Sequence, residues 1–143
     1  MTIFIHSDQA SQTLKQRIID DLTAHDYEVI DLAIEQPSDD ITEITRAVTE
    51  RVAEHSGSKG IIIDRYSIAP FILANKYKNI ICAMISDEQS AKMTCRHNNT
   101  NVITLGSETV GTLVALNCVR TFLQATYDGG RHQIRIDMLN HLC

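Results

Sequence analysis

The feature of this sequence that most constrains its fold is a regular alternation between short apolar runs and longer segments of helical period. The apolar runs cover 3–5, 28–32, 60–63, 80–85 and 101–105, and the helical segments cover 10–24, 40–55, 69–77, 87–98 and 109–125. The runs GIII and IICAMI are apolar at successive positions, which is typical of strands buried on both faces of a parallel sheet. The sequence therefore predicts an α/β fold: a three-layer α/β/α, Rossmann-like domain with a five-stranded parallel sheet.

The length and charge of the chain exclude several kinds of protein. With 143 residues, 43% of them hydrophobic and 22% charged, the chain has the composition of a globular protein, and we expect a single domain over residues 1–143. The net charge of −5 and the lack of a basic run argue against nucleic acid and membrane surfaces as partners. No positively charged region opens the sequence, and no apolar run has the length of a membrane span. We therefore expect a cytoplasmic protein.

The four cysteines, at 82, 95, 118 and 143, form no C-x-x-C pair. Cys82 and Cys118 lie within strongly apolar segments, where a small buried thiol fits well. This pattern favours free thiols in a reducing compartment.

The last segment, RHQIRIDMLNHLC, predicts an extra C-terminal helix outside the alternating pattern. Ile134, Met138 and Leu142 recur every fourth residue along one stripe, with Leu139 beside them. Such a helix packs either on its own domain or on another subunit, and the sequence leaves both alternatives open.

Polar residues follow the strands at the edge of the sheet where ligands bind in folds of this type. They are Ser7-Asp8, Asp64, Ser86-Asp87 and Ser107-Glu108. We expect Ser86 and Asp87 to act as N-caps of the following helix. Asp8 is either an N-cap or a ligand, because Ser11 offers a competing cap.

The richest polar cluster is Cys95-Arg96-His97-Asn98-Asn99, at the end of a helix. A metal site is not expected, because Cys95 and His97 project from different faces of a helix and no further ligand stands at suitable spacing. The cluster is either a helix C-cap or the position of an acid or base, since the imidazole of His97 titrates near neutrality.

A second cluster, GGRHQIR at 129–135, combines two glycines, a helix start and arginines four residues apart. Free N–H groups at the helix start, with Arg131 and Arg135 on one face, describe an anion site suited to phosphate. The alternative is a loop followed by two solvated arginines. No G-x-G-x-x-G or Walker loop occurs, so the sequence gives no specific support for a nucleotide cofactor.

Several segments in order resemble the family of ribose-5-phosphate isomerase B and galactose-6-phosphate isomerase over the whole chain. They are SD at 7–8, GIII at 60–63, ANK at 74–76, SDEQSAKMTCRHNNTNVITLG at 86–106 and DGGRHQIR at 128–135. The likeness is strongest to A-type subunits of galactose-6-phosphate isomerases. It implies an aldose-ketose isomerase without metal or cofactor that interconverts D-galactose 6-phosphate and D-tagatose 6-phosphate through a cis-enediol. It also implies a complex with a homologous B subunit.

The sequence departs from this family at two places. The resemblance implies a Cys-Gly-Thr-Gly loop after the third strand, with cysteine as the base, but the chain has Asp64-Arg65-Tyr66-Ser67 there. The histidine that the family places after Ser-Asp is replaced by Gln9. We expect this loop to be inactive, with an ion pair between Asp64 and Arg65.

The other half of the family's site is retained. The resemblance implies that His97 opens the sugar ring and that Asn98 binds a sugar or enediolate oxygen. It further implies that Arg131 and Arg135 bind the phosphate, and we add Asp8 as a substrate-binding residue. A homologous B subunit that supplies the cysteine would complete a shared active site. The alternatives are a homo-oligomeric ribose-5-phosphate isomerase B-like enzyme that uses Asp64 as its base, and an inert scaffolding paralogue.

Overall fold

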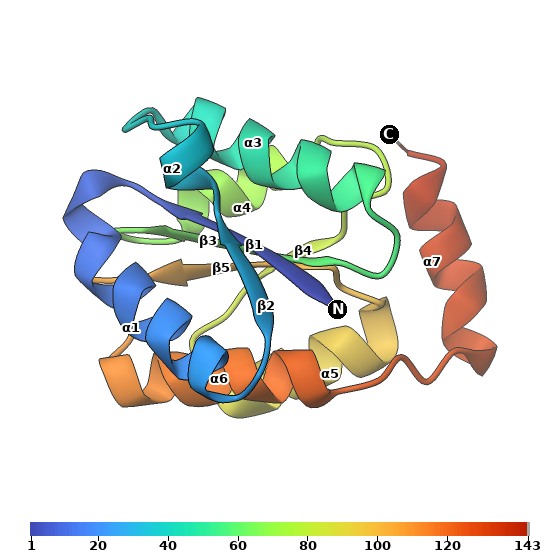
Figure 1. The fold of residues 1–143 in the computed structure, drawn as a ribbon. Helices are drawn as coiled ribbons and strands as arrows, with labels where there is room; N and C mark the ends of the chain where they lie inside the picture. The colour runs from blue at the N-terminus through green and yellow to red at the C-terminus, as the bar shows by residue number, and fades with distance from the viewer. Residues whose placement is uncertain (143) are drawn as a thin grey trace.

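Five parallel strands form the central sheet of the computed structural model, which describes residues 1–142 (Figure 1). The strands are β1 (Thr2–Ser7), β2 (Glu28–Asp31), β3 (Lys59–Asp64), β4 (Cys82–Met84) and β5 (Val102–Gly106). They lie side by side in the order β2-β1-β3-β5-β4. The predicted α/β fold with five parallel strands is confirmed.

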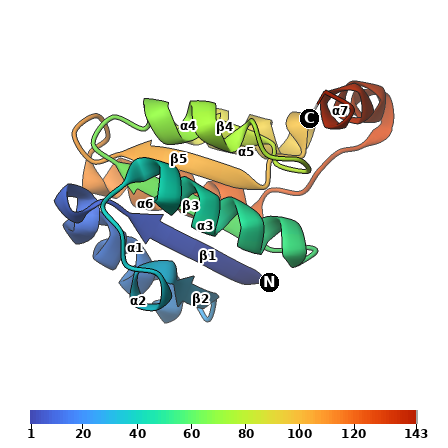
Figure 2. The same cartoon turned by 90° about the horizontal axis from the view of Figure 1, so that it is seen from above.

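Helices cover both faces of this sheet. The α-helices are α1 (Gln12–Ala24), α2 (Leu32–Glu35), α3 (Ile41–Glu54), α4 (Ile68–Ala74), α5 (Glu88–Asn98), α6 (Thr112–Gln124) and α7 (Gln133–Asn140), with 3-10 turns η1 (Gln9–Ser11) and η2 (Gly130–His132). Helices α1, α5 and α6 pack on one face, and α3 and α4 pack on the other (Figures 1 and 2). The layers match the order of apolar runs and helical segments in the sequence.

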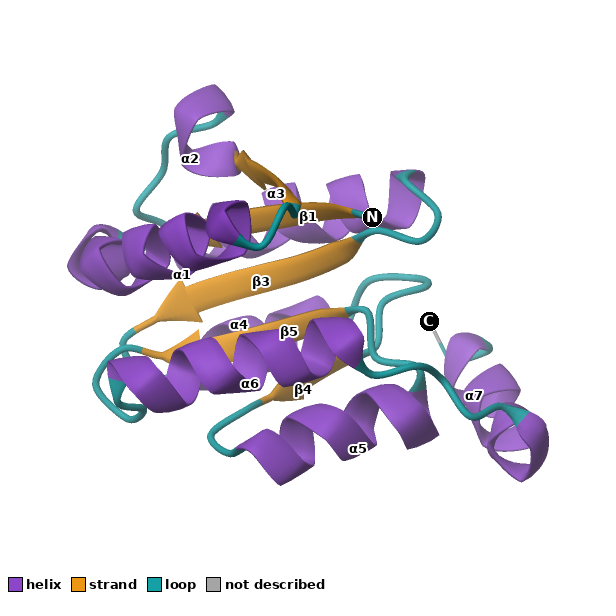
Figure 3. Cartoon of the chain, turned by 60° about the horizontal axis from the view of Figure 1, so that its bottom comes forward, coloured by secondary structure: helices purple, strands orange, loops and turns teal. Residues whose placement is uncertain are grey.

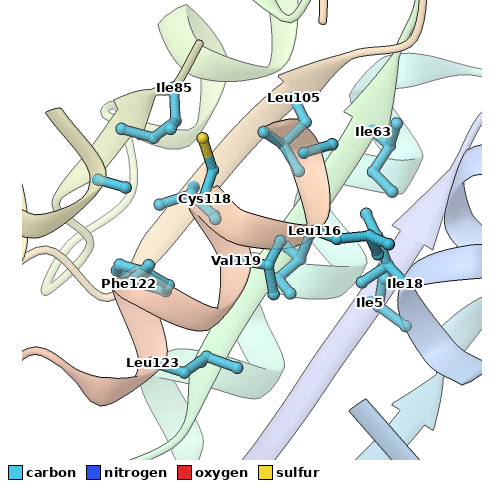
Figure 4. Close-up of a cluster of buried hydrophobic side chains, with 14 of the residues drawn as sticks. Ile5, Ile18, Ile63, Ile85, Leu105, Leu116, Cys118, Val119, Phe122 and Leu123 are labelled. Atoms are coloured by element: carbon cyan, nitrogen blue, oxygen red, sulfur yellow. The ribbon is translucent and has the colours of Figure 1, made fainter. Parts of the chain in front are cut away.

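The larger hydrophobic core lies between the sheet and α1, α5 and α6. Figure 4 shows Val119 and Phe122 of α6 in the same cluster as the strand residues Ile5 and Ile63, and all four side chains are fully or almost fully buried. Because the strands are apolar at successive positions, their side chains alternate between this core and a second one. Ile62 packs in the second core, between the sheet and helices α3 and α4.

Strand β4 is shorter than the apolar run at 80–85 predicts. The N–H of Ile81 donates to the side-chain oxygen of Asn101 at 3.0 Å, and the N–H of Cys82 donates to the side chain of Asn75 at 2.9 Å. Because these side chains replace a neighbouring strand as partners, the regular ladder begins only at Cys82.

Helix α7 lies at the amino ends of the strands, outside the three layers (Figures 1 and 3). Its buried residue is Ile136, whereas the predicted apolar stripe is exposed: Ile134 by 72%, Met138 by 66% and Leu142 by 79%. The helix therefore packs on its own domain through Ile136, and its exposed stripe remains available for a contact with another subunit. Cys143 lies outside the described residues.

Candidate functional site

The predicted site residues lie at opposite ends of the parallel strands, which we call the carboxyl edge and the amino edge of the sheet. Asp8 follows the carboxyl end of β1, and Asp64 ends the neighbouring strand β3. His97 and Asn98 lie at the end of α5, which leads into the start of β5 and therefore reaches the amino edge. Because all strands are parallel, one chain cannot bring these two groups to the same point.

Asp8 acts as a helix cap at the carboxyl edge. Its Oδ1 accepts a hydrogen bond from the N–H of Ser11 at 2.8 Å, whereas Ser11 makes no capping bond with its own side chain. The N–H of Asp8 donates to the carbonyl of Ile63 at 3.2 Å and so ties the loop to β3. The capping alternative for Asp8 is thus realised.

The capping prediction for Asp87 is confirmed by its bond from the N–H of Ser90, but Ser86 is not the cap of α5.

The loop after β3 is held by a hydrogen bond between two of its own residues. The Asp64 carboxylate accepts the N–H of Ser67, whose backbone adopts a left-handed conformation with φ of 64°. Burial, and the nearby charge of Asp8, raise the pKa of the Asp64 carboxyl. Within residues 1–142 Asp64 forms no ion pair with Arg65, so that prediction was wrong. The half-buried carboxylate is instead bound by a backbone N–H of its own loop.

The segment after β5 fixes this loop in place. The N–H of Ser107 donates to the carbonyl of Asp64 at 2.8 Å, and the N–H of Glu108 donates to the carbonyl of Arg65 at 2.9 Å. A side chain at Gly106 would approach the Arg65 carbonyl to 3.0 Å, so this position requires glycine. The loop that replaces the family's cysteine loop is therefore held by backbone bonds over most of its length.

The amino edge carries the second cluster, built at the end of α5. Asn99 is its C-cap, in a left-handed conformation with φ of 52° and with its N–H bonded to the carbonyl of Cys95. The capping interpretation therefore applies to Asn99, while His97 in the last turn keeps its ring free for another contact. That ring stacks on the ring of His132, with centroids 4.5 Å apart and planes 15° apart.

An ion pair brings the chain after α6 to the end of α5. Arg96 Nε donates to Asp128 Oδ1 at 3.0 Å and to Oδ2 at 3.1 Å, and a terminal nitrogen of the guanidinium lies 2.9 Å from Oδ2. A hydrogen bond to this guanidinium lowers the pKa of the Asp128 carboxyl. The N–H of Asp128 also donates to the carbonyl of Arg96 at 2.9 Å. These contacts place the following residues beside His97.

The two glycines after Asp128 turn the chain towards α7. Gly129 and Gly130 have positive φ angles of 62° and 59°, which favour glycine over residues with a side chain. Arg131 and Arg135 follow, both exposed, and within residues 1–142 neither guanidinium forms a hydrogen bond or an ion pair. The loss of water around the ring of His132, and the nearby charges of His97 and both arginines, lower the pKa of His132. The edge therefore carries two unpaired cations close to two imidazoles, an arrangement suited to a dianion.

Asn98 faces a hollow next to this cluster. Its side-chain N–H donates to the hydroxyl of Thr94 at 3.3 Å. The hollow has a volume of about 560 Å³, is bordered by α4, β4, α5 and α7, and includes Met84 and Leu139 in its lining. Asn98 is the predicted site residue that lines it.

The structure brings together His97, Asn98, Arg131 and Arg135 and leaves Asp8 at the other edge. It adds two residues that the sequence reasoning quoted within a motif but did not single out, His132 and Asp128. Their signal was the unbroken motif DGGRH, in which an acid, two glycines and a histidine surround the first arginine.

The described residues offer no obvious metal site or membrane segment. Across residues 1–142, no group of three or more His, Cys, Asp or Glu side chains is placed to bind a metal ion. None of the helices in this range is both long and apolar enough to cross a bilayer. Cys82, Cys95 and Cys118 are buried free thiols, and burial raises the pKa of Cys118 to about 11.

Comparisons with known proteins find full-length relatives. The chain is 44% identical to galactose-6-phosphate isomerase subunit LacA 1 of Streptococcus agalactiae serotype III (strain NEM316), over 100% of both chains. It is 45% identical to galactose-6-phosphate isomerase subunit LacA of Staphylococcus aureus (strain Newman), again over 100% of both.

Solved structures with the same fold are ribose-5-phosphate isomerases B. The enzyme of Mycoplasma genitalium with bound ribulose-5-phosphate matches with a TM-score of 0.92 and 33% identity, covering 99% of this chain and 95% of that one. The enzyme of Clostridium thermocellum matches with a TM-score of 0.90 and 34% identity, covering 99% and 97%. The profile of the Ribose/Galactose Isomerase family matches residues 3–139. With its fold, its full-length relatives and this match in agreement, the chain belongs to the Ribose/Galactose Isomerase family.

Proposed function

We propose that this chain is the A-type subunit of a galactose-6-phosphate isomerase, and that its active site is completed by a homologous B-type subunit. The activity is taken from its full-length relatives, which are named as subunits LacA of that enzyme. The observation that supports a shared site is the position of the two polar clusters at opposite edges of one sheet, with the Asp64 carboxylate bound by its own loop.

In this proposal the amino-edge cluster binds the sugar phosphate and opens its ring. Arg131 and Arg135 hold the phosphate. His97 takes the proton of the C1 hydroxyl and passes it to the ring oxygen, so that the bond between C1 and the ring oxygen breaks and an aldehyde forms. Asn98 donates a hydrogen bond to a sugar oxygen on which charge develops.

The carbon-bound proton is moved by the partner. A cysteine thiolate of the B-type subunit removes the proton from C2, the C1 oxygen gains a proton, and a cis-enediol results. The same thiol then returns a proton to C1 as the C2 hydroxyl becomes a carbonyl, giving the ketose. No oxidant is needed, because one proton moves from C2 to C1 and a second moves from the C2 hydroxyl to the C1 oxygen.

Asp8 plays a different part in this arrangement. It lies at the edge opposite His97, so it reaches a substrate only in a second intersubunit site, where the partner supplies the amino-edge cluster. We propose it as a substrate ligand of that second site, in addition to its role as a cap. The exposed stripe of Ile134, Met138 and Leu142 supports a subunit contact close to the amino edge.

The buried free thiols also support a location. Cys82, Cys95 and Cys118 are all reduced and lie in the core. Proteins with such thiols suit a reducing compartment, and we infer that the enzyme acts in the cytoplasm.

The test is reconstitution. We expect the purified chain to have at most trace isomerase activity on galactose 6-phosphate, and activity to appear on mixing with a B-type homologue that retains the cysteine loop. A mixture with the cysteine-to-alanine variant of that homologue is the control and should stay inactive. Turnover by the pure chain at the rate of the mixture would contradict the shared site and favour the homo-oligomeric enzyme, and ribose 5-phosphate as the better substrate would assign the pentose reaction. An active complex that is indifferent to loss of His97 would favour the scaffolding paralogue.

A further inference from the structure

We propose that His132 is a positioning residue for His97: the two stacked imidazoles hold the His97 ring in place and disfavour a second positive charge on the pair. This inference rests on the proposed function, because it concerns the step in which His97 opens the sugar ring. His132 has no part in the phosphate binding or the proton transfer of the proposed function.

The stack joins two elements that are far apart in the sequence. His97 lies in the last turn of α5, and His132 ends η2, just before α7. Their ring centroids are 4.5 Å apart, at the short end of the range for aromatic pairs, and their planes differ by only 15°. The face of His132 therefore covers the face of His97 and restricts the directions in which its nitrogens can point.

The backbone around His132 is fixed. The N–H of His132 donates to the carbonyl of Gly129 at 3.2 Å, which closes the turn. Asp128, the residue before Gly129, is bound to Arg96 through both its side chain and its backbone. Because Arg96 directly precedes His97, this contact joins the two segments that carry the stacked rings.

Charged groups on every neighbouring element face the pair. Arg131 of η2 and Arg135 of α7 supply positive charge, and Asp128 from the preceding loop supplies negative charge that Arg96 of α5 largely engages. The reduced hydration of the His132 ring, followed by the charges of His97 and the two arginines, lowers the pKa of His132. The surroundings of the stack therefore favour the neutral form of His132.

A neutral neighbour suits the ring-opening step. When His97 accepts the proton of the C1 hydroxyl it becomes an imidazolium, and the face of a neutral aromatic ring attracts such a cation. A protonated His132 would repel it, because two like charges would then lie on stacked rings. The proposal thus links the position and the protonation of His97 to one contact.

Kinetics of the reconstituted complex test the positioning role. We expect His132→Ala to lower kcat about 2- to 10-fold, the scale of one stacking contact, with KM changed less than about twofold. We expect His132→Phe to recover most of kcat, because an aromatic plane is restored. Equal losses in kcat for both variants would overturn the proposal, as would a rise in KM alone, which would assign His132 to phosphate binding.

A titration by NMR tests the coupling without any activity. In the full chain, the titration midpoint of His132 should rise when His97 is replaced in His97→Phe, because a like charge is removed while the stack remains. His25→Phe, at the end of α1 where His25 bonds to the carbonyl of Asp21, is the matched control and should leave the midpoint unchanged. An unchanged midpoint in His97→Phe would refute the pair even in an active enzyme. A raised midpoint in a complex that lacks isomerase activity would refute only the proposed function.

Discussion

Asp128 binds Arg96 with its carboxylate and with its backbone N–H at the same time. The carboxylate accepts two hydrogen bonds from Nε of the guanidinium, at 3.0 and 3.1 Å, and the N–H donates to the Arg96 carbonyl at 2.9 Å. The chain between α6 and α7 is thereby fixed at the end of α5. This contact decides where the glycine turn begins, and hence where the two arginines lie relative to His97.

The first prediction concerns this contact. Asp128→Asn in the reconstituted complex should raise KM for the sugar phosphate up to about fivefold, since the pair is partly exposed and such pairs contribute little each. We expect the change in KM and not in kcat, because Arg131 and Arg135 lose their position for binding phosphate while proton transfer by His97 is unaffected. Steady-state kinetics measure it, and Arg46→Gln is the control, because Arg46 pairs with Glu50 on an exposed face of α3. A fall in kcat with KM unchanged would contradict this assignment.

The same pair makes a prediction about pH. The Arg96 guanidinium lowers the pKa of the Asp128 carboxyl, so the contact is complete above the usual range of an aspartate. Its contribution is lost only as pH falls through the lowered pKa of the folded state, below about pH 3.9. The side-chain carboxyl carbon resonance of Asp128 should therefore show its own titration step only below about pH 4. In Asp128→Asn that step should be absent, and a carboxyl step of Asp128 above the usual range of an aspartate in the parent would refute the pairing.

The second prediction concerns ring opening. His97→Ala in the complex should lower turnover of the cyclic sugar phosphate by a factor on the order of 10² to 10⁴, the scale of removing a positioned acid or base. Substrate supplied in its open-chain form should be affected much less, because that proton transfer is already complete. Burst kinetics with freshly generated open-chain substrate separate the two. Equal losses on both forms would show that His97 acts elsewhere in the reaction.

The third prediction separates phosphate binding from chemistry. Arg131→Ala or Arg135→Ala should each raise KM roughly 10- to 100-fold, the effect of one charge-assisted contact of about 1.5 to 3 kcal/mol. The value of kcat should fall less, since the phosphate keeps its charge in the transition state. Lysine at either position should rescue only in part, because a point charge lacks the forked geometry of the guanidinium. Competitive inhibition by inorganic phosphate is the direct readout, and inhibition as tight as in the parent would show that the arginines form a solvated face.

The fourth prediction concerns stability at the other edge. Lys15 donates to both oxygens of Asp31, at 2.9 and 2.7 Å, and the two side chains are only 4% and 15% exposed. Asp31 also caps α2 through the N–H of Ala33. Asp31→Ala should reduce the free energy of unfolding by about 3 to 5 kcal/mol, because it leaves a buried ammonium without a partner.

Urea unfolding of the chain checks that figure. Lys15→Met should cost less than Asp31→Ala, because it removes the buried charge itself. Glu50→Gln, in the exposed pair with Arg46, is the control and should change the stability by less than about 1 kcal/mol. A loss for Asp31→Ala no larger than for Glu50→Gln would contradict the buried pair.

The fold could be read from the sequence because its signals are local. Apolar residues at successive positions mark strands buried on both faces, and the predicted runs fall on β1 to β5. The errors lie where side chains compete with the backbone. Asn75 and Asn101 replace a strand as partners and shorten β4, and Asp31 caps the short helix α2 within the turn after β2.

The candidate site was predicted only in its residue types. The sequence left a helix cap or an acid or base open at 95–99; Asn99 is the cap, and the acid-base role of His97 stays a prediction. The sequence did not predict that Asp64 bonds to Ser67 and that, within residues 1–142, Arg65 forms no ion pair with it, because a left-handed residue in a loop is not visible in a pattern of charges. The stack of His97 on His132 depends on where two distant segments meet.

The sequence by itself determined the order of strands and helices, the acidic surface and the residue types of the phosphate cluster, since each follows from composition or from spacing along a few turns. Only the tertiary structure decided that the ring of His97 stacks on the ring of His132, and that the apolar stripe of α7 stays exposed. Both features depend on where segments that are distant in the sequence meet. Those meeting points are fixed by the packing of the helices and loops around the sheet, which no local pattern contains.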